Sequence, residues 1–159
     1  MLSSVMSRAF VKDTDSDGSE TLPERAISSS PNLVTESGLK MMDTCIHELE
    51  AARTGARAES DNALVARIDR DLRYWRQRRS TAKLVQPPQK RDRVRFGLRA
   101  TLKLEDGSEY AFRLVGEDEA DPVAGLISYA SPIGNALMSQ AVGDEVELMG
   151  RRATIVAID

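Results

Sequence analysis

The stretch FRLVGEDEADPVAGLISYASPIGNALMSQAVGDEV, from Phe112 to Val146, decides the fold of the C-terminal part of this chain. An apolar run stops at Gly116, and an acidic loop at 117–121 follows it. Further on, Ser131 can accept hydrogen bonds from the free N–H groups that begin a helix, and Pro132 fits a first helical turn. The stretch therefore predicts a strand, an acidic loop and a short helix, in that order.

The residues on either side of this stretch alternate between apolar and polar side chains, as expected of half-buried antiparallel strands. Asp106-Gly107 is a hairpin-turn sequence between two such runs. In the short helix, apolar residues three and four apart predict one buried face, made by Ile133, Ala136 and Leu137. We expect strands at 98–104, 110–114, 145–148 and 153–158. Residues 93–159 therefore predict a small antiparallel β domain with one short helix.

The segments VGEDEADP, ISYASPIGNAL and VGDEV closely resemble the C-terminal domain of the bacterial Gre transcript-cleavage factors. The resemblance implies an FKBP-like, β-rich fold that docks on RNA polymerase at the mouth of its secondary channel. The charge of the acidic loop also predicts a basic partner surface, because clustered carboxylates repel one another without a basic group nearby. We expect the polymerase-binding face to contain Glu117, Asp118, Glu119, Asp121, Ser128, Ser131, Pro132 and Ile133.

The middle of the chain has the apolar spacing of two helices. A first helix is predicted after Thr35, a candidate N-cap, because Leu39, Met42, Ile46 and Leu49 follow at spacings of three and four. Gly55 is placed to stop that helix or to shape a turn. A second helix should begin near Ser60 or Asp61 and end before Pro87-Pro88. Neither helix could bury its apolar stripe alone, so we expect an antiparallel hairpin.

These elements divide the chain into three segments with an α+β fold. Polar runs in residues 1–31 predict a disordered tail, since such runs bury too little surface to offset the entropy of ordering. Residues 32–92 form the antiparallel coiled-coil hairpin and a linker, with 12 basic and 9 acidic residues. Residues 93–159 form the β domain, with 7 basic and 11 acidic residues.

The Gre factors also place a helical hairpin ahead of the β domain, and the likeness here lies in NLVTESGL and RIDRDLRYWRQRR. The hairpin of this chain looks shorter by about ten residues per helix, or roughly 15 Å of reach. In the family, carboxylates at the hairpin tip help to hold magnesium at the active site of the polymerase. Glu59 and Asp61 are the candidate tip carboxylates here. Alternatively, Asp61 or Ser60 caps the second helix, with Glu59 favourable near its positive N-terminus.

Arg67, Arg70, Arg73 and Arg76 recur every three residues along the second helix and make a basic strip. The resemblance implies contact with the transcript, and the planar fork of arginine suits phosphate. The alternative is pairing within the hairpin. Its acidic candidates are Asp43, Glu48, Glu50, Asp69 and Asp71.

Several classes of function are excluded by composition. Cys45 is the only cysteine and His47 the only histidine, so the chain assembles neither a disulfide framework nor a zinc site. No apolar run approaches the roughly 18 residues of a membrane span. We expect a cytoplasmic protein with no cofactor of its own, although it could assist magnesium that the polymerase binds.

We interpret the chain as a regulator of transcription elongation that is not itself an enzyme. Its expected partner is bacterial RNA polymerase, with nascent RNA or DNA in the elongation complex as possible contacts. The short hairpin favours a non-cleaving competitor that enters or caps the secondary channel. The alternative is a factor that stimulates transcript cleavage through its tip carboxylates.

Overall fold

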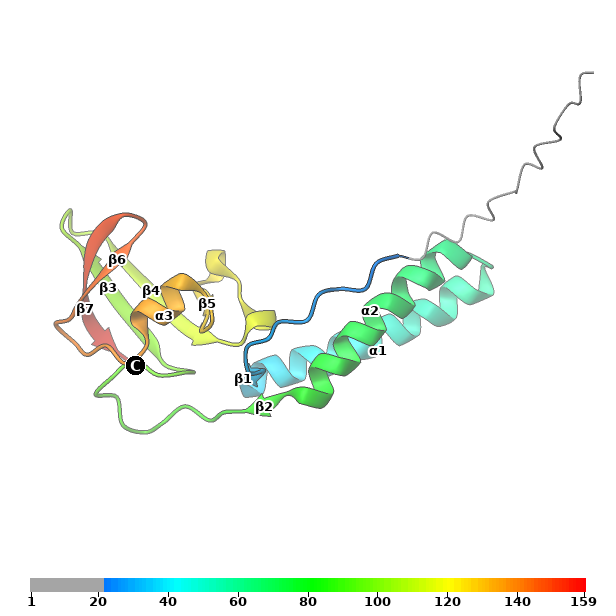
Figure 1. The fold of residues 1–159 in the computed structure, drawn as a ribbon, viewed down its shortest axis with the longest axis horizontal. Helices are drawn as coiled ribbons and strands as arrows, with labels where there is room; N and C mark the ends of the chain where they lie inside the picture. The colour runs from blue at the N-terminus through cyan, green and yellow to red at the C-terminus, as the bar shows by residue number, and fades with distance from the viewer. Residues whose placement is uncertain (1–21) are drawn as a thin grey trace, which may run out of the picture.

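A computed structural model describes residues 22–159. Figure 1 shows an elongated molecule in which a two-helix hairpin projects from a small β domain. Within residues 22–159, no helix is both long enough and apolar enough to cross a membrane. The predicted α+β class is confirmed.

The hairpin consists of α1 (Glu36–Ala58) and α2 (Asn62–Thr81). Thr35 caps α1 by accepting a hydrogen bond from the Gly38 N–H, and Asp61 caps α2 by accepting from the Leu64 N–H. Both predicted caps are therefore confirmed. The expectation that Gly55 ends the first helix is wrong, because α1 continues to residue 58. Nothing lies within 4 Å of the position that a Gly55 Cβ atom would occupy, so this turn of α1 has room for a side chain and does not require glycine.

An apolar seam joins the two helices. Met42 and Leu72 are fully buried, and Ile68 packs beside Ala56 with Ile46 partly buried against them. Burying each large aliphatic side chain contributes about 1.5 to 3 kcal/mol, which exceeds the helix propensity of any single residue. The seam explains why the spacing of three and four in the sequence produces a hairpin.

The β domain is a five-stranded sheet in the order β5-β4-β3-β7-β6. Its elements are β3 (Arg99–Leu104), β4 (Glu109–Val115), β5 (Leu126–Ser128), α3 (Pro132–Leu137), β6 (Glu145–Leu148) and β7 (Arg151–Ile158). The pairs β3–β4, β3–β7 and β6–β7 are antiparallel as expected, but β4 and β5 are parallel. Residues 116–125, which include the acidic loop, cross over between them and bring β5 back in the same direction.

The core of the β domain lies between the sheet and α3. Leu102, Leu114 and Ile155 are fully buried, and Leu137 of α3 joins them. Ala136 was expected to share this buried face but is exposed. Because α3 has only six residues, its inward face consists mainly of Leu137, with Ile133 partly buried beside the core.

The base of the hairpin is closed by a parallel pair of two-residue strands, β1 (Leu33–Val34) and β2 (Lys83–Leu84). Before β1, residues 22–31 run in an extended conformation along α2 (Figure 1). Disorder was expected for residues 1–31, and for 22–31 this is corrected by defined contacts. One of them is a hydrogen bond from the Tyr129 hydroxyl to the carbonyl of Pro31. Residues 1–21 lie outside the described part of the chain.

Candidate functional site

The acidic loop lies at the junction between the hairpin and the β domain, where it meets Arg78 of α2. The Arg78 side chain is only 3% exposed, and its Nε lies 2.5 Å from Oδ2 of Asp118, which is 7% exposed. A second guanidinium nitrogen of Arg78 lies 3.6 Å from Oε2 of Glu117. Both carboxylates belong to a 3₁₀ turn, η1 (Glu117–Glu119). The basic partner that the clustered carboxylates require is thus within the same chain.

Tyr74 of α2 extends this cluster. Its hydroxyl donates a short hydrogen bond to Oδ1 of Asp118, the carboxylate that Arg78 also contacts. Burial, and then this hydrogen bond, raise the pKa of Tyr74 from 10.0 to about 12. The shared carboxylate therefore ties two side chains of α2 to η1.

Glu119, the third carboxylate of η1, holds the start of α1. Its side chain accepts hydrogen bonds from the Thr35 backbone N–H at 3.0 Å, from the Thr35 hydroxyl, and from the Gly116 N–H at 3.2 Å. A Cβ atom on Gly38 would lie 2.2 Å from the carboxyl carbon of Glu119. Gly38 is therefore required for this carboxylate to reach the helix cap. Through η1, the β domain therefore contacts both the first turn of α1 and the last turns of α2.

Only part of the expected docking face points outward. Asp121 and Pro132 are exposed, whereas Ser128 and Ile133 are partly buried. Ser131 caps α3, because its Oγ accepts from the Gly134 N–H at 3.0 Å; the same Oγ donates to the Ser128 carbonyl at 2.7 Å.

Val123, which the sequence analysis missed, is 99% exposed in a second 3₁₀ turn, η2 (Pro122–Ala124). An isolated valine in an acidic loop gives no periodic signal. The outward surface of the acidic loop and α3 thus includes Asp121, Val123 and Pro132.

The hairpin tip carries both candidate carboxylates. Oδ1 of Asp61 accepts from the Leu64 N–H at 3.0 Å, which confirms the capping alternative for this residue. Glu59 follows the last residue of α1, is exposed and makes no ion pair within residues 22–159. Ser60 between them has a positive φ of 58°, which completes the tight turn. The tip therefore presents one unengaged carboxylate and one that is held by its own helix.

The basic strip of α2 is largely paired with acidic residues. Arg76 bonds to Glu50 at 2.7 Å, and Arg70 lies 3.2 Å from Asp71, as the alternative of pairing within the hairpin predicts. Arg73 instead pairs at 2.5 Å with Glu24 of the extended segment, which the sequence analysis did not include among its partners. Arg67 is exposed and makes no ion pair within the described chain.

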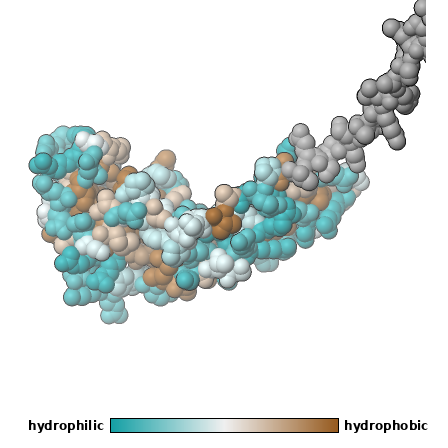
Figure 2. Space-filling view, viewed as in Figure 1, coloured by the Kyte–Doolittle hydropathy of each residue, from teal (hydrophilic) through white to brown (hydrophobic). Residues whose placement is uncertain are grey.

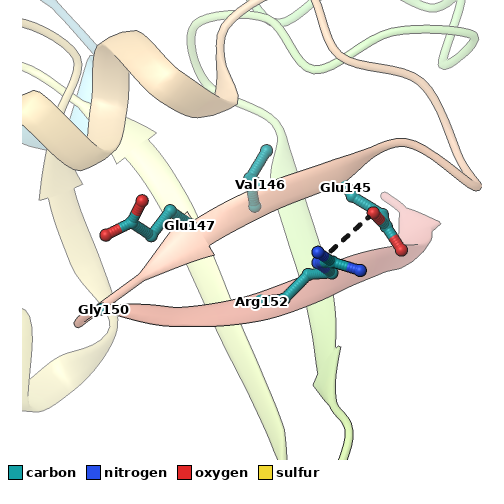
Figure 3. A pocket seen from close by; sticks show the side chains of 5 residues that line it. All are labelled: Glu145, Val146, Glu147, Gly150 and Arg152. Carbon is teal, nitrogen blue, oxygen red and sulfur yellow. Dashed lines mark ion pairs between the residues drawn. The ribbon is translucent and has the colours of Figure 1, made fainter.

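A shallow hollow on the β domain lies beside the turn between β6 and β7. Figure 3 shows Glu145 and Arg152 facing one another from the two strands, with Glu147 on the other side of Val146. Glu145 and Arg152 form an ion pair at 3.6 Å. Residues 22–159 contain no group of three or more metal-ligating side chains that could hold an ion. This hollow is a weaker candidate than the outward surface of the acidic loop and α3, or than the hairpin.

Comparison with known proteins identifies the family. A family model described as the C-terminal part of transcription elongation factor GreA/GreB matches residues 88–159. GreB of Yersinia pestis is 33% identical over 134 residues, which cover 72% of this chain and 78% of that protein. GreA of Sphingopyxis alaskensis is 47% identical over 57 residues, 36% of each chain. The solved structure of a GreA/GreB factor from Nitrosomonas europaea is 20% identical, with a TM-score of 0.40, and covers 79% of this chain and 97% of that one. On the extent of the GreB match, this chain belongs to the GreA/GreB family of transcription elongation factors.

Proposed function

We propose that this protein binds bacterial RNA polymerase, places its hairpin in or over the secondary channel, and does not stimulate transcript cleavage. It would then compete with longer Gre factors for the same position. The observation that carries this proposal is the hairpin, which is short, fixed at its base and poor in unengaged carboxylates at its tip. The alternative function is stimulation of cleavage through Glu59 and Asp61. It would need a hairpin that reaches the metal and carries free carboxylates at its tip.

The first support is length. The match to Y. pestis GreB spans 134 positions but only 72% of 159 residues, about 114, so about 20 positions of GreB have no counterpart here. The match to S. alaskensis GreA shows no such deficit, because its 57 residues are 36% of this chain. Removing about ten residues from each arm of a hairpin shortens it by roughly 15 Å. The deficit is therefore of the size that the sequence predicts for a shortened hairpin.

Reach is decisive because metal coordination is short-ranged. A carboxylate oxygen must come within about 2.0 to 2.1 Å of magnesium to bind it, and side-chain rotation moves an oxygen by only a few Å. The 23 residues of α1 span about 35 Å, and the 20 residues of α2 about 30 Å. A tip that stops roughly 15 Å short cannot contribute a ligand to a metal at the bottom of the channel.

The junction prevents the hairpin from compensating by a change of direction. Arg78 and Tyr74 hold α2 to η1 through Asp118, while Glu119 holds the cap of α1. Tilting the hairpin would separate these partners and lose the hydrogen bonds that Asp118 and Glu119 make with both helices. Direction and length of the hairpin are thus both set within the chain.

Docking itself is assigned to the outward surface of the β domain formed by Asp121, Val123 and Pro132, together with Ser128, Ser131 and Ile133 of the expected face. Glu117, Asp118 and Glu119 are assigned to the junction instead, because their carboxylates contact the two helices. An exposed valine beside a carboxylate suits a partner surface that combines an apolar patch with a basic group.

The docking assignment is tested with Pro132→Glu in the full chain. Pro132 is exposed at the first position of α3, where a carboxylate is favourable, so we expect the fold to be unchanged. Pull-down of purified polymerase should weaken about tenfold or more. Val156→Glu, at an exposed position on β7, is the matched control and should bind as the unmodified protein does. Equal binding by both variants would contradict the assignment.

A further inference from the structure

Residues 22–31, here called the strap, lie along α2 (Figure 1) and contact it through two adjacent residues, Glu24 and Arg25. The Glu24 carboxylate accepts from Arg73 through both Nε, at 3.0 Å, and a terminal nitrogen, at 2.5 Å. The next residue, Arg25, stacks its guanidinium 3.7 Å from the ring centre of Tyr74 and 5.6 Å from that of Trp75. The strap therefore covers one arginine and two aromatic rings of the hairpin.

The surface of α2 under the strap combines arginine side chains with aromatic rings. Six of the twenty residues of α2 are arginines and two are aspartates, so this helix carries the positive charge of the hairpin. Figure 2 shows that the surface along the hairpin is mainly hydrophilic. Proteins that bind single-stranded nucleic acid combine cationic side chains for the backbone with aromatic rings for the bases. Arg73, Tyr74 and Trp75 supply this combination in consecutive positions.

The two strap contacts reproduce the two parts of a nucleotide. A carboxylate held by both edges of the Arg73 fork occupies the place in which arginine binds a phosphate. A planar guanidinium stacked on Tyr74 occupies the place of a stacked base. Hydrogen bonds from Arg73 lower the pKa of the Glu24 carboxyl, so this group is fully anionic near neutral pH, as a phosphate would be.

We propose that the strap is an autoinhibitory segment that occupies a binding surface for single-stranded nucleic acid on α2, with Glu24 in place of a phosphate and Arg25 in place of a base. The strap and a polynucleotide then compete for Arg73 and Tyr74. Binding requires release of the strap, so the strap sets the concentration at which the surface becomes available.

The contacts that hold the strap on α2 are weak enough for the strap to be released. The side chains of Glu24 and Arg73 are 62% and 57% exposed, and exposed ion pairs contribute little. The pair between Arg25 and Asp71 is longer, at 3.7 Å. A polynucleotide that contacts several arginines at once gains a counterion-release term that the strap lacks. Arg67, which has no ion pair within residues 22–159, is available for a second phosphate.

The test uses the full chain and a short fluorescein-labelled oligouridine, with binding followed by anisotropy at low salt. Glu24→Ala with Arg25→Ala removes the contacts of both strap side chains with α2 and leaves the net charge unchanged. If the strap leaves the surface open about one tenth of the time, this double variant should bind about tenfold more tightly. Adding Arg73→Ala should abolish the gain. This test needs no polymerase, so its failure would leave the proposed function unaffected.

The matched control is Glu145→Ala with Arg152→Ala, which breaks an exposed ion pair on the β domain and also conserves charge. It should bind oligouridine as the unmodified protein does. Trp75 is the only tryptophan, so its emission reports the strap directly. Oligouridine added to the unmodified protein should shift this emission in the same direction as the strap substitutions do. Equal affinity of the strap variant and the unmodified protein, a gain that survives Arg73→Ala, or absence of binding by every variant would each overturn the proposal.

Discussion

Replacing Arg78 by alanine should loosen the hairpin from the β domain more than any other single truncation on α2. Arg78 is 3% exposed and is the only cation within 4 Å of Asp118 in the described chain. Alanine leaves the nearly buried Asp118 carboxylate with the Tyr74 hydroxyl as its remaining contact. Glu117, whose Oε2 is buried without a hydrogen bond, loses its neighbouring positive charge as well.

The expected magnitude follows from the burial of this pair. Removing one member of a buried ion pair costs about 3 to 5 kcal/mol, because the other charge stays buried and uncompensated. We expect the lower end, about 3 kcal/mol, since Glu117 is 26% exposed and water can reach the junction from its side. Replacing the pair together, with Arg78→Met and Asp118→Leu, should recover most of this loss, because neither charge then remains.

Urea unfolding followed by Trp75 emission and by circular dichroism measures this effect. The unmodified chain should give one transition by both probes, and Arg78→Ala should shift the hairpin transition to lower urea, ahead of the β domain. Arg79→Ala is the control next in sequence, since its pair with Asp43 is exposed on both sides, and it should change little. If Arg78→Ala and Arg79→Ala gave the same small shift, the role assigned to the junction would be refuted.

Two further predictions concern the same junction. Gly38→Ala should destabilise the chain by about 1 to 2 kcal/mol, because its Cβ displaces the Glu119 carboxylate from its hydrogen bonds. Gly55→Ala, in the open part of α1, should stabilise it by up to about 1 kcal/mol, so urea midpoints that move in the same direction would contradict this. Because the pKa of Tyr74 is raised to about 12, its contribution to stability is complete below pH 10 and is lost as pH rises through about 12. Tyr74→Phe should remove this loss between pH 10 and 12 in urea titrations, and an unchanged pH dependence would show that Tyr74 is not its source.

Sequence patterns predicted the elements that local chemistry determines. Thr35, Asp61 and Ser131 cap helices as expected, because an N-cap needs only its own next turn. The strand at Glu145–Leu148 also has its expected bounds. The apolar spacing of α1 and α2 predicted the seam, since periodicity records which face is buried.

The contacts that fix the functional geometry could not be predicted in this way. Arg78 stands in the run WRQRR, whose arginines are typical of a solvated basic surface, and its partner Asp118 is 40 residues away. Glu24 and Arg73 are 49 residues apart, and nothing in either segment specifies the other. The parallel pairing of β4 with β5 depends on how the intervening loop crosses, which a three-residue apolar run does not reveal. Pairings between distant polar residues leave no periodic trace.

We propose that this protein binds the polymerase without supplying a metal ligand. This proposal is tested most directly with stalled elongation complexes that contain labelled transcript, magnesium and this protein, with and without a full-length Gre factor. We expect little or no cleavage by this protein alone, and we expect it to inhibit the Gre factor until more Gre factor is added. Glu59→Ala with Asp61→Asn should leave the inhibition intact, apart from a helix-cap loss of about 1 kcal/mol. Robust magnesium-dependent cleavage that disappears in this double variant would overturn the role of competitor and assign Glu59 and Asp61 to the metal.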